Sequence, residues 1–159
     1  SLQPSASARC RNGELVHLSV EPILQALEVG LVPLVYGDVA LDEVLGGTIA
    51  STEELFVYLA PLLRPSRILL LGRVPGVLNQ DGDVIPQITP ATHTRWVDVL
   101  SGSGAVDVTG GMADKVVRMV TLVEKQPEMK VQILTGGTPR LLTRVLLGDE
   151  PRVGTTIRS

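Results

Sequence analysis

The chain has 159 residues, of which 44% are hydrophobic and 19% charged, and its formal net charge is −3 at pH 7. This length and composition are ordinary for one folded domain, and the negative net charge offers no basic surface for nucleic acid. No apolar run approaches the roughly 20 residues of a membrane-spanning helix, and Cys10 is the single cysteine, which excludes an internal disulfide and a zinc site of several thiolates. We therefore expect a cytoplasmic protein that binds neither nucleic acid nor a membrane.

The first half of the chain alternates apolar runs with helical patterns. Residues 1–7 lack an initiator methionine and the layout of a signal peptide, so we expect a chain that is entered partway through. The patterns that follow predict a strand edge at 15–18, a helix at 22–29, a buried strand at 31–36, a hairpin of 39–41 and 48–49, and a helix from a capping box at 51–54 to Pro65.

The second half continues the alternation. Its patterns predict a strand at 67–71, a ligand-binding type of loop from Gly72 onward, a helix at 92–100, a long amphipathic helix from Met112 to about 127, a strand at 131–134, a helix at 139–147 and an extended end at 154–157. Parallel strands need crossover connections, which are usually helical. The order therefore predicts an α/β fold in which helices cover both faces of a mostly parallel sheet, a three-layer sandwich.

The best local candidate for chemistry is the segment 109–115. Gly110 and Gly111 precede a predicted helix, and Lys115 follows about one turn later. Free backbone N–H groups at a helix start and an ammonium group together suit a phosphate. A glycine pair before a helix is also plain turn chemistry, and the pattern alone leaves both interpretations open.

Gly37 and Asp38 follow a predicted buried strand, which is where α/β sheets carry ligand loops. An aspartate there can hold a substrate or orient a lysine, although a simple Gly-Asp turn explains the pair equally. Ser51 and Glu53 can be polar groups of a site, but helix capping already accounts for Ser51 and the helix dipole for Glu53. His17 and His93 lie far apart in the sequence, and neither has a Cys or carboxylate nearby at the spacing of metal ligands. No metal ligand is therefore assigned.

Three segments in order, 33–39, 49–53 and 107–115, resemble the motifs of isopentenyl phosphate kinases, which belong to the amino acid kinase superfamily. The segments 135–137, 146–148 and 154–158 resemble the closing part of the same family. The similarity therefore runs over nearly the whole chain.

The resemblance implies an amino acid kinase (carbamate kinase-like) fold and an ATP- and Mg²⁺-dependent kinase that phosphorylates isopentenyl phosphate to isopentenyl diphosphate. Such chemistry consists largely of positioning and neutralising phosphate oxygens. The resemblance places Lys115 on the ATP phosphates, as a catalytic residue together with Asp38 and Glu53. It also assigns two sets of binding residues: Gly72, Arg73, Leu78, Gly110 and Gly111 for the nucleotide, and Gly37, Asp38 and Ser51 for the acceptor phosphate.

The resemblance further implies that residues 1–159 are the C-terminal, nucleotide-binding portion of a kinase domain, without the N-terminal lysine and glycine-rich loop of the family. We expect such a portion to be inactive alone, and we expect the whole protein to be a homodimer acting on a small-molecule phosphate acceptor. Two alternatives stay open: a fosfomycin kinase-like protein that acts on a phosphonate, and a nucleotide-binding or oligomerising module without catalysis.

Overall fold

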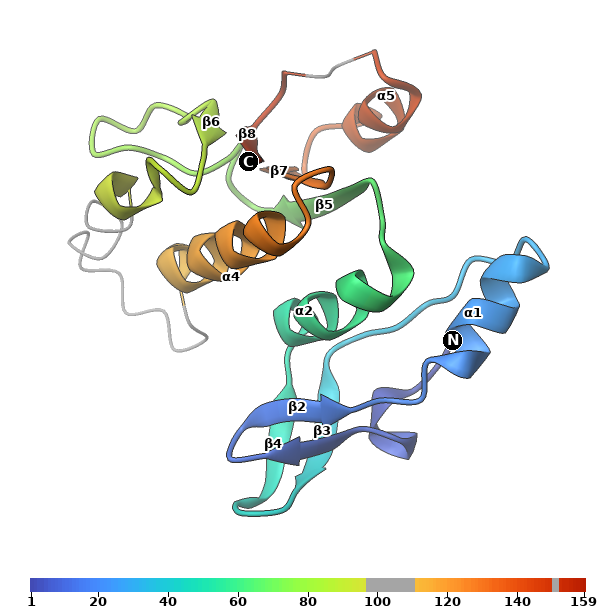
Figure 1. Cartoon of the computed structure of the whole chain (residues 1–159). Coiled ribbons are helices and arrows are strands. Elements are labelled where there is room, and N and C mark those ends of the chain that lie inside the picture. Colours follow the sequence, from blue (N-terminus) through green and yellow to red (C-terminus); the bar gives the residue numbers. More distant parts are fainter. Residues whose placement is uncertain (97–110, 150–151) are drawn as a thin grey trace. The chain divides into compact units, whose positions relative to one another are not determined.

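The structure is a computed structural model that describes residues 1–96, 111–149 and 152–159. The chain divides into two compact units, Ser1–Leu63 and Arg64–Ser159 (Figure 1). Each unit contains a four-stranded sheet. The α/β class predicted from the sequence is therefore confirmed.

The first unit combines two hairpins with two α-helices. Its elements are η1 (Pro4–Ala6), β1 (Arg9–Arg11), β2 (Glu14–His17), α1 (Glu21–Glu28), β3 (Asp38–Asp42), β4 (Gly46–Ala50) and α2 (Thr52–Leu63). The sheet has the order β2-β1-β3-β4, in which parallel pairing of β1 with β3 joins two antiparallel hairpins. The core includes Cys10, Ala40, Ala50 and Leu55, so small side chains from the strands meet a leucine of α2.

One buried carboxylate organises both hairpin turns. The Asp42 carboxylate accepts hydrogen bonds from the backbone N–H groups of Asn12 and Gly13 in one turn and of Val44 and Leu45 in the other, at 2.7–3.0 Å. Burial by itself raises the pKa of Asp42, but the four backbone donors outweigh it and hold the pKa at about 2. The charged carboxylate thus ties the two turns together.

The second unit has helices on both faces of its sheet. Its elements are β5 (Arg67–Gly72), β6 (Gln87–Ile88), α4 (Met112–Lys125), β7 (Lys130–Thr135), α5 (Leu141–Leu147) and β8 (Thr155–Ile157). The strand order is β5-β7-β8-β6, with only β7 and β8 antiparallel. Figure 1 shows α4 and α5 on opposite faces of this sheet, and the buried stripe of α4 includes Val116, Met119, Val120 and Val123. The predicted three layers are present in this unit.

Pairing is more mixed than predicted. Two of the three strand pairs in the second sheet are parallel, but only one of the three strand pairs in the first sheet is. The first sheet differs because β1–β2 and β3–β4 are tight hairpins, which join antiparallel strands. The short strand β6 has no apolar run of its own, and the sequence patterns did not predict it. The helix predicted from 139 begins at Leu141.

The largest disagreement concerns residues 31–36. The predicted buried strand is not formed, and Leu31, Val32 and Leu34 are exposed. A strand exists only where a neighbour supplies hydrogen-bond partners. Within the described part of the chain, the backbone bonds of this run join Leu31 N to the Ala26 carbonyl and Leu2 N to the Leu34 carbonyl, both at 2.8 Å.

Two other predictions fall partly outside the described residues. Of the helix predicted at 92–100, residues 93–96 are helical and residues 97–100 lie outside the described ranges, as do residues 106–109 and Gly110.

Among the helices that the structure describes, none has the length and apolar character needed to cross a bilayer.

Candidate functional site

The carboxyl ends of β5 and β7 meet at one edge of the second sheet. The two strands are parallel and in register from Arg67 opposite Lys130 to Gly72 opposite Thr135. Gly136 N donates to the Gly72 carbonyl at 2.9 Å, and Gly137 N donates to Thr135 Oγ1 at 3.1 Å. Two glycine-containing loops therefore leave the sheet side by side, at the kind of edge where α/β proteins bind ligands.

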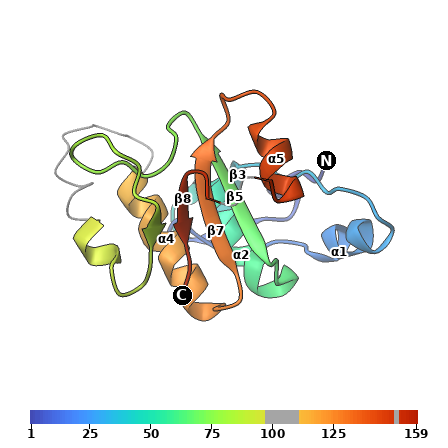
Figure 2. The ribbon, with the colours of Figure 1, turned by 90° about the horizontal axis from the view of Figure 1, so that it is seen from above.

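Helix α4 begins at the same edge. It runs antiparallel to β5 and β7, so that its first turn lies toward their carboxyl ends (Figure 2). Gly111 is the N-cap residue and, as a glycine, offers no side-chain cap to this helix start, whose first N–H groups have no acceptor within the helix. The half-buried Lys115 follows one turn later. The sequence-predicted residues Gly72, Arg73, Gly111 and Lys115 thus belong to one edge, where backbone donors, a helix dipole and an ammonium group suit an anion.

The loop that follows β5 is anchored by a hydrogen bond to a threonine of β8. Val77 N donates to the fully buried Thr155 Oγ1 at 2.8 Å. A Cβ placed on Gly76 would come within 2.8 Å of the same Oγ1 atom and of Val84, so only glycine fits between the loop and β8. Leu78 then forms an antiparallel bridge with Val84. Thr155 therefore fixes the start of the loop that carries the predicted nucleotide residue Leu78.

In the first unit, the four predicted residues Gly37, Asp38, Ser51 and Glu53 lie together around the start of α2. Asp38 pairs with Ala50 across the hairpin, directly before Ser51. A Cβ on Gly37 would lie 3.3 Å from the Ala50 carbonyl oxygen and 3.4 Å from the Thr52 nitrogen. Gly37 therefore keeps the backbone donors at the helix start uncovered.

The Asp38 carboxylate is ordered by backbone donors. Its Oδ2 atom accepts from Ser5 N at 3.1 Å and its Oδ1 atom from Val39 N at 2.9 Å. Hydrogen bonds from Ser5, first from its hydroxyl and then from its backbone N–H, lower the pKa of Asp38. Asp38 is thus a fixed negative charge next to the start of α2.

The capping box predicted at the start of α2 is confirmed. Ser51 Oγ accepts from Glu54 N at 3.2 Å, and the Glu54 carboxylate accepts from Ser51 N at 2.8 Å. The Ser51 hydroxyl therefore has a structural partner, as helix capping predicted. Glu53 lies half-buried in the first turn.

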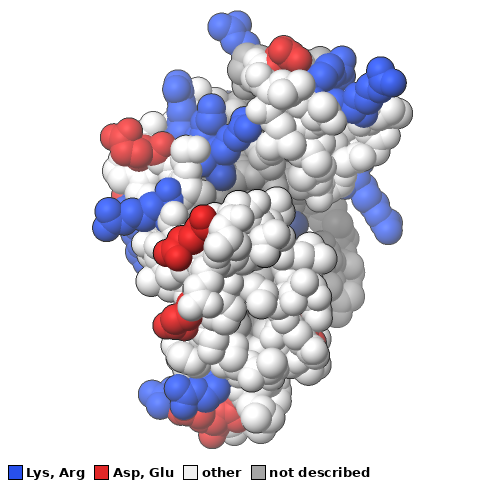
Figure 3. Space-filling view, turned by 90° about the vertical axis from the view of Figure 1, so that its right-hand side faces the viewer, with Lys and Arg blue, Asp and Glu red and all other residues white. Residues whose placement is uncertain are grey.

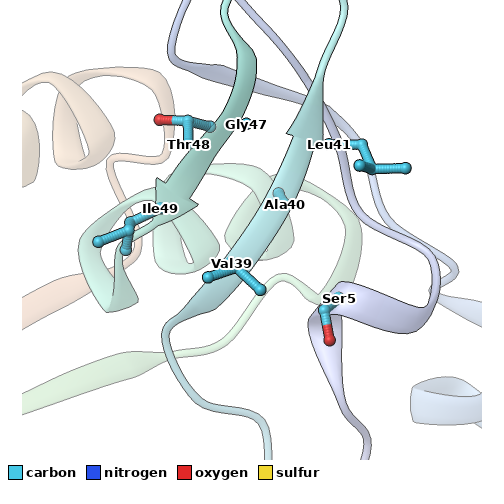
Figure 4. Close-up of a pocket in the computed structure, with 7 residues that line it drawn as sticks. All are labelled: Ser5, Val39, Ala40, Leu41, Gly47, Thr48 and Ile49. Atoms are coloured by element: carbon cyan, nitrogen blue, oxygen red, sulfur yellow. The ribbon is translucent and has the colours of Figure 1, made fainter.

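The hollow beside this group is mainly apolar. It lies on β3 and β4 and is lined by Ser5, Val39, Ala40, Leu41, Gly47, Thr48 and Ile49 (Figure 4). None of these residues is charged, so the hollow itself offers no countercharge for a phosphate. In this unit, the residues predicted to bind the acceptor phosphate lie around the start of α2 instead.

Sequence reasoning identified glycines, charges and caps, but it missed the loop-holding role of Thr155. From local patterns, the sequence predicts Gly154 and Thr155 only as part of an extended end at 154–157. Its partner Val77 lies 78 residues away, and no local pattern signals such a contact. Gly110 lies outside the described residues, so its role in nucleotide binding stays a prediction.

Comparison with known proteins gives a consistent family. The model of the amino acid kinase family matches residues 2–135. The chain is 35% identical to isopentenyl phosphate kinase of Methanothermobacter thermautotrophicus over 168 residues, which is 99% of this chain and 60% of that protein. It is 44% identical to the enzyme of the same name from Haloferax volcanii over 118 residues, which is 74% of this chain and 46% of the relative.

The fold agrees with these matches. A crystal structure of an isopentenyl phosphate kinase superposes with a TM-score of 0.77 and 30% identity, covering 98% of this chain and 57% of that one. The chain thus spans about half the length of the curated relatives it matches. With a family model over most of its residues and relatives above 30% identity, this chain belongs to the amino acid kinase family.

Proposed function

We propose that this chain supplies the ATP-binding part, and a portion of the acceptor site, of a kinase that passes the γ-phosphoryl group of ATP to the phosphate of isopentenyl phosphate. The observation that carries the proposal is the edge formed by Gly72, Gly136 and the start of α4 with Lys115. The proposal takes its acceptor from the relatives, two of which, both named isopentenyl phosphate kinase, are 35% and 44% identical to this chain.

The chemistry fits the residues available. Phosphoryl transfer needs positioned donors and positive charge around the phosphate oxygens rather than a nucleophilic side chain. The N–H groups at the start of α4 and the Lys115 ammonium would hold ATP phosphates, and the loop from Gly72 to Leu78 would line the nucleotide pocket. The N–H groups at the start of α2, left open by Gly37, would face the acceptor phosphate.

Magnesium would accompany ATP and screen the phosphate charges during transfer. The described residues contain no group of three or more His, Cys, Asp or Glu side chains that could hold a metal ion. Mg²⁺ does not require such a group, because one or two carboxylates together with substrate phosphates commonly hold it. Asp38 and Glu53, which lie around the start of α2, are the carboxylates that we propose for this role.

A titration of the 159-residue chain with ATP and Mg²⁺, followed by calorimetry, tests the nucleotide site. Lys115→Ala removes a charge-assisted contact and should weaken ATP binding about tenfold or more. Lys125→Ala, in the last turn of the same helix, is the matched control and should bind as the unsubstituted chain does. Absence of ATP binding, or equal losses in both variants, would contradict the proposal.

The acceptor and the completeness of the site need separate measurements. Isopentenyl phosphate, N-acetylglutamate and fosfomycin, each titrated in the presence of a non-hydrolysable ATP analogue, distinguish the acceptor classes, and we expect only the first to bind. Because the chain spans about half the length of its relatives, we propose that the chain alone does not catalyse phosphoryl transfer. Measurable formation of isopentenyl diphosphate by the purified chain would show that this second proposal is wrong. Homodimerisation stays a prediction.

A further inference from the structure

The second sheet has a hollow on the face that carries α5. Lys130, Gln132 and Leu134 lie two residues apart along β7, so their side chains point to the same face. Leu134 packs there against α5, whereas Lys130 and Gln132 line a hollow of about 490 Å³. In Figure 2, α5 lies toward the β5 side of this sheet and β8 toward the other side. The described residues that line the hollow come from β6, β7, β8 and the segments next to them.

The floor of the hollow is a row of polar side chains without charge. The register places Gln132 beside Thr156 and Thr156 beside Gln87, so these side chains follow one another across three strands. Gln132 is only 5% exposed, and its Nε2 atom donates to the Val153 carbonyl at 2.6 Å. A buried amide normally has such a partner. This hydrogen bond ties the segment that carries Arg152 to the sheet.

Two cations lie side by side at one end of the row. Val131 of β7 pairs with Ile157 of β8 in antiparallel register, so the next residues outward are Lys130 and Arg158. Both of them line the hollow. The backbone of Arg158 is held in place, because its N–H group donates to the Ile88 carbonyl at 3.3 Å. Like charges that face one another across two strands are destabilising, and a bound anion between them would remove that repulsion.

Positive charge is not balanced in this hollow by the residues that the structure describes. Arg152 is the third cation of its lining, and no described carboxylate belongs to the lining. Within the same described ranges, Lys130, Arg152 and Arg158 form no ion pair. In Figure 3, Lys and Arg side chains gather in the upper part of the view, at the height of β7 and β8 in Figure 1, and outnumber Asp and Glu side chains there.

The spacing of the cations indicates the kind of anion. Arg152 is joined to the sheet at Gln132, two residues along β7 from the pair of Lys130 and Arg158. Two residues of a strand span roughly 7 Å, so two linked anionic groups suit the hollow better than one. Arginine forks and a lysine ammonium are the usual partners of phosphate oxygens. The volume of the hollow is in the range of sites for small molecules.

We propose that this hollow binds a small molecule through a diphosphate group, with one phosphate at Lys130 and Arg158 and the other at Arg152. The amide and hydroxyl groups of the floor would bind the bridging part. The site is separate from the proposed nucleotide edge, because Lys130 begins β7 and Thr135 ends it, which places the two ends roughly 16 Å apart. The proposal therefore does not depend on ATP binding.

The test is a calorimetric titration of the 159-residue chain with inorganic diphosphate, with EDTA present and without Mg²⁺. We expect one molecule to bind per chain. Inorganic phosphate should bind at least about tenfold more weakly, because it cannot reach both groups of cations. Amide chemical shifts in the nuclear magnetic resonance spectrum should change at residues 130–132 and 152–158. ADP distinguishes the sources: shifts in the same segments would assign the site to diphosphate esters, and shifts with inorganic diphosphate alone would assign it to the free anion.

Three single variants make the site specific. Lys130→Gln and Arg158→Gln each remove one charge from the strand-end pair and should weaken diphosphate binding about tenfold or more. Arg118→Gln removes an exposed charge from α4, on the other face of the sheet, and should leave binding unchanged. All three side chains are exposed, and circular dichroism should show the variants folded.

Several results would overturn the proposal. Diphosphate may fail to bind, or inorganic phosphate may bind equally well. Lys130→Gln and Arg158→Gln may leave the affinity unchanged, or Arg118→Gln may lower it as much as they do. Shift changes confined to Gly72, Gly136 and residues 111–115 would show that diphosphate occupies the nucleotide edge instead.

Discussion

The capping box of α2 gives a prediction whose size follows from the structure. In Ser51→Ala the Glu54 N–H loses its acceptor, now 3.2 Å away, while the Glu54 carboxylate keeps its bond to Ser51 N. Loss of an N-cap side chain costs about 1 kcal/mol of unfolding free energy. For a chain of this size that corresponds to a fall in melting temperature of roughly 2–4 °C.

Thermal unfolding followed by circular dichroism measures this shift, with Ser51→Asp and Ser51→Thr as controls that retain an acceptor oxygen. We expect both controls to unfold near the temperature of the unsubstituted chain. Glu54→Ala should also destabilise, and the double variant should cost less than the two single losses together, because the residues share one box. An unchanged melting temperature in Ser51→Ala, or equal losses in all three Ser51 variants, would refute the capping explanation and favour a role in substrate binding.

Three further predictions concern buried contacts. Gly154→Ala should destabilise the chain by at least about 2 kcal/mol in chemical denaturation, because Gly154 has φ +73 and an added Cβ would overlap the Ile133 carbonyl oxygen; a wild-type midpoint would contradict this. Thr155→Val removes the acceptor of Val77 N, so ATP affinity should fall while Thr155→Ser, which retains the hydroxyl, stays close to normal in the same calorimetric titration. The pKa of Asp42 is depressed from 3.8 to about 2 in the folded chain, so its stabilising contribution is complete above pH 3.8 and is lost as the pH falls toward 2. Asp42→Asn should therefore flatten that part of the curve of unfolding free energy against pH. An unchanged slope would be inconsistent with the role assigned to Asp42.

The kinase proposal rests on how two separate helix starts are built. The start of α4 has Gly111 as its N-cap residue, which offers no side-chain acceptor to the first N–H groups. The start of α2 is capped by Ser51, yet Gly37 keeps the neighbouring Thr52 nitrogen uncovered. Phosphate-binding sites commonly use such backbone donors, since these need no reorganisation when the ligand arrives.

Local sequence by itself determined the elements whose cause is local. The apolar stripe from Met112 predicts α4, and the spacing of Ser51 and Glu54 predicts a capping box, both of which the structure contains. Each depends on residues within one or two turns of chain, where propensity and hydrogen-bonding geometry are sufficient. The motif order was likewise readable from sequence, and the family it indicated is confirmed.

Only the tertiary structure decided features that need a distant partner. The apolar run at 31–36 has the composition of a buried strand but forms no strand and leaves Leu31, Val32 and Leu34 exposed, because a strand requires a neighbour that composition cannot supply. Thr155 became a support for the loop at Val77 through a bond across 78 residues, and Asp42 became the tie between two turns through four backbone donors. Periodicity reports which face of an element is apolar, whereas the identity of what covers that face is set by contacts remote in sequence.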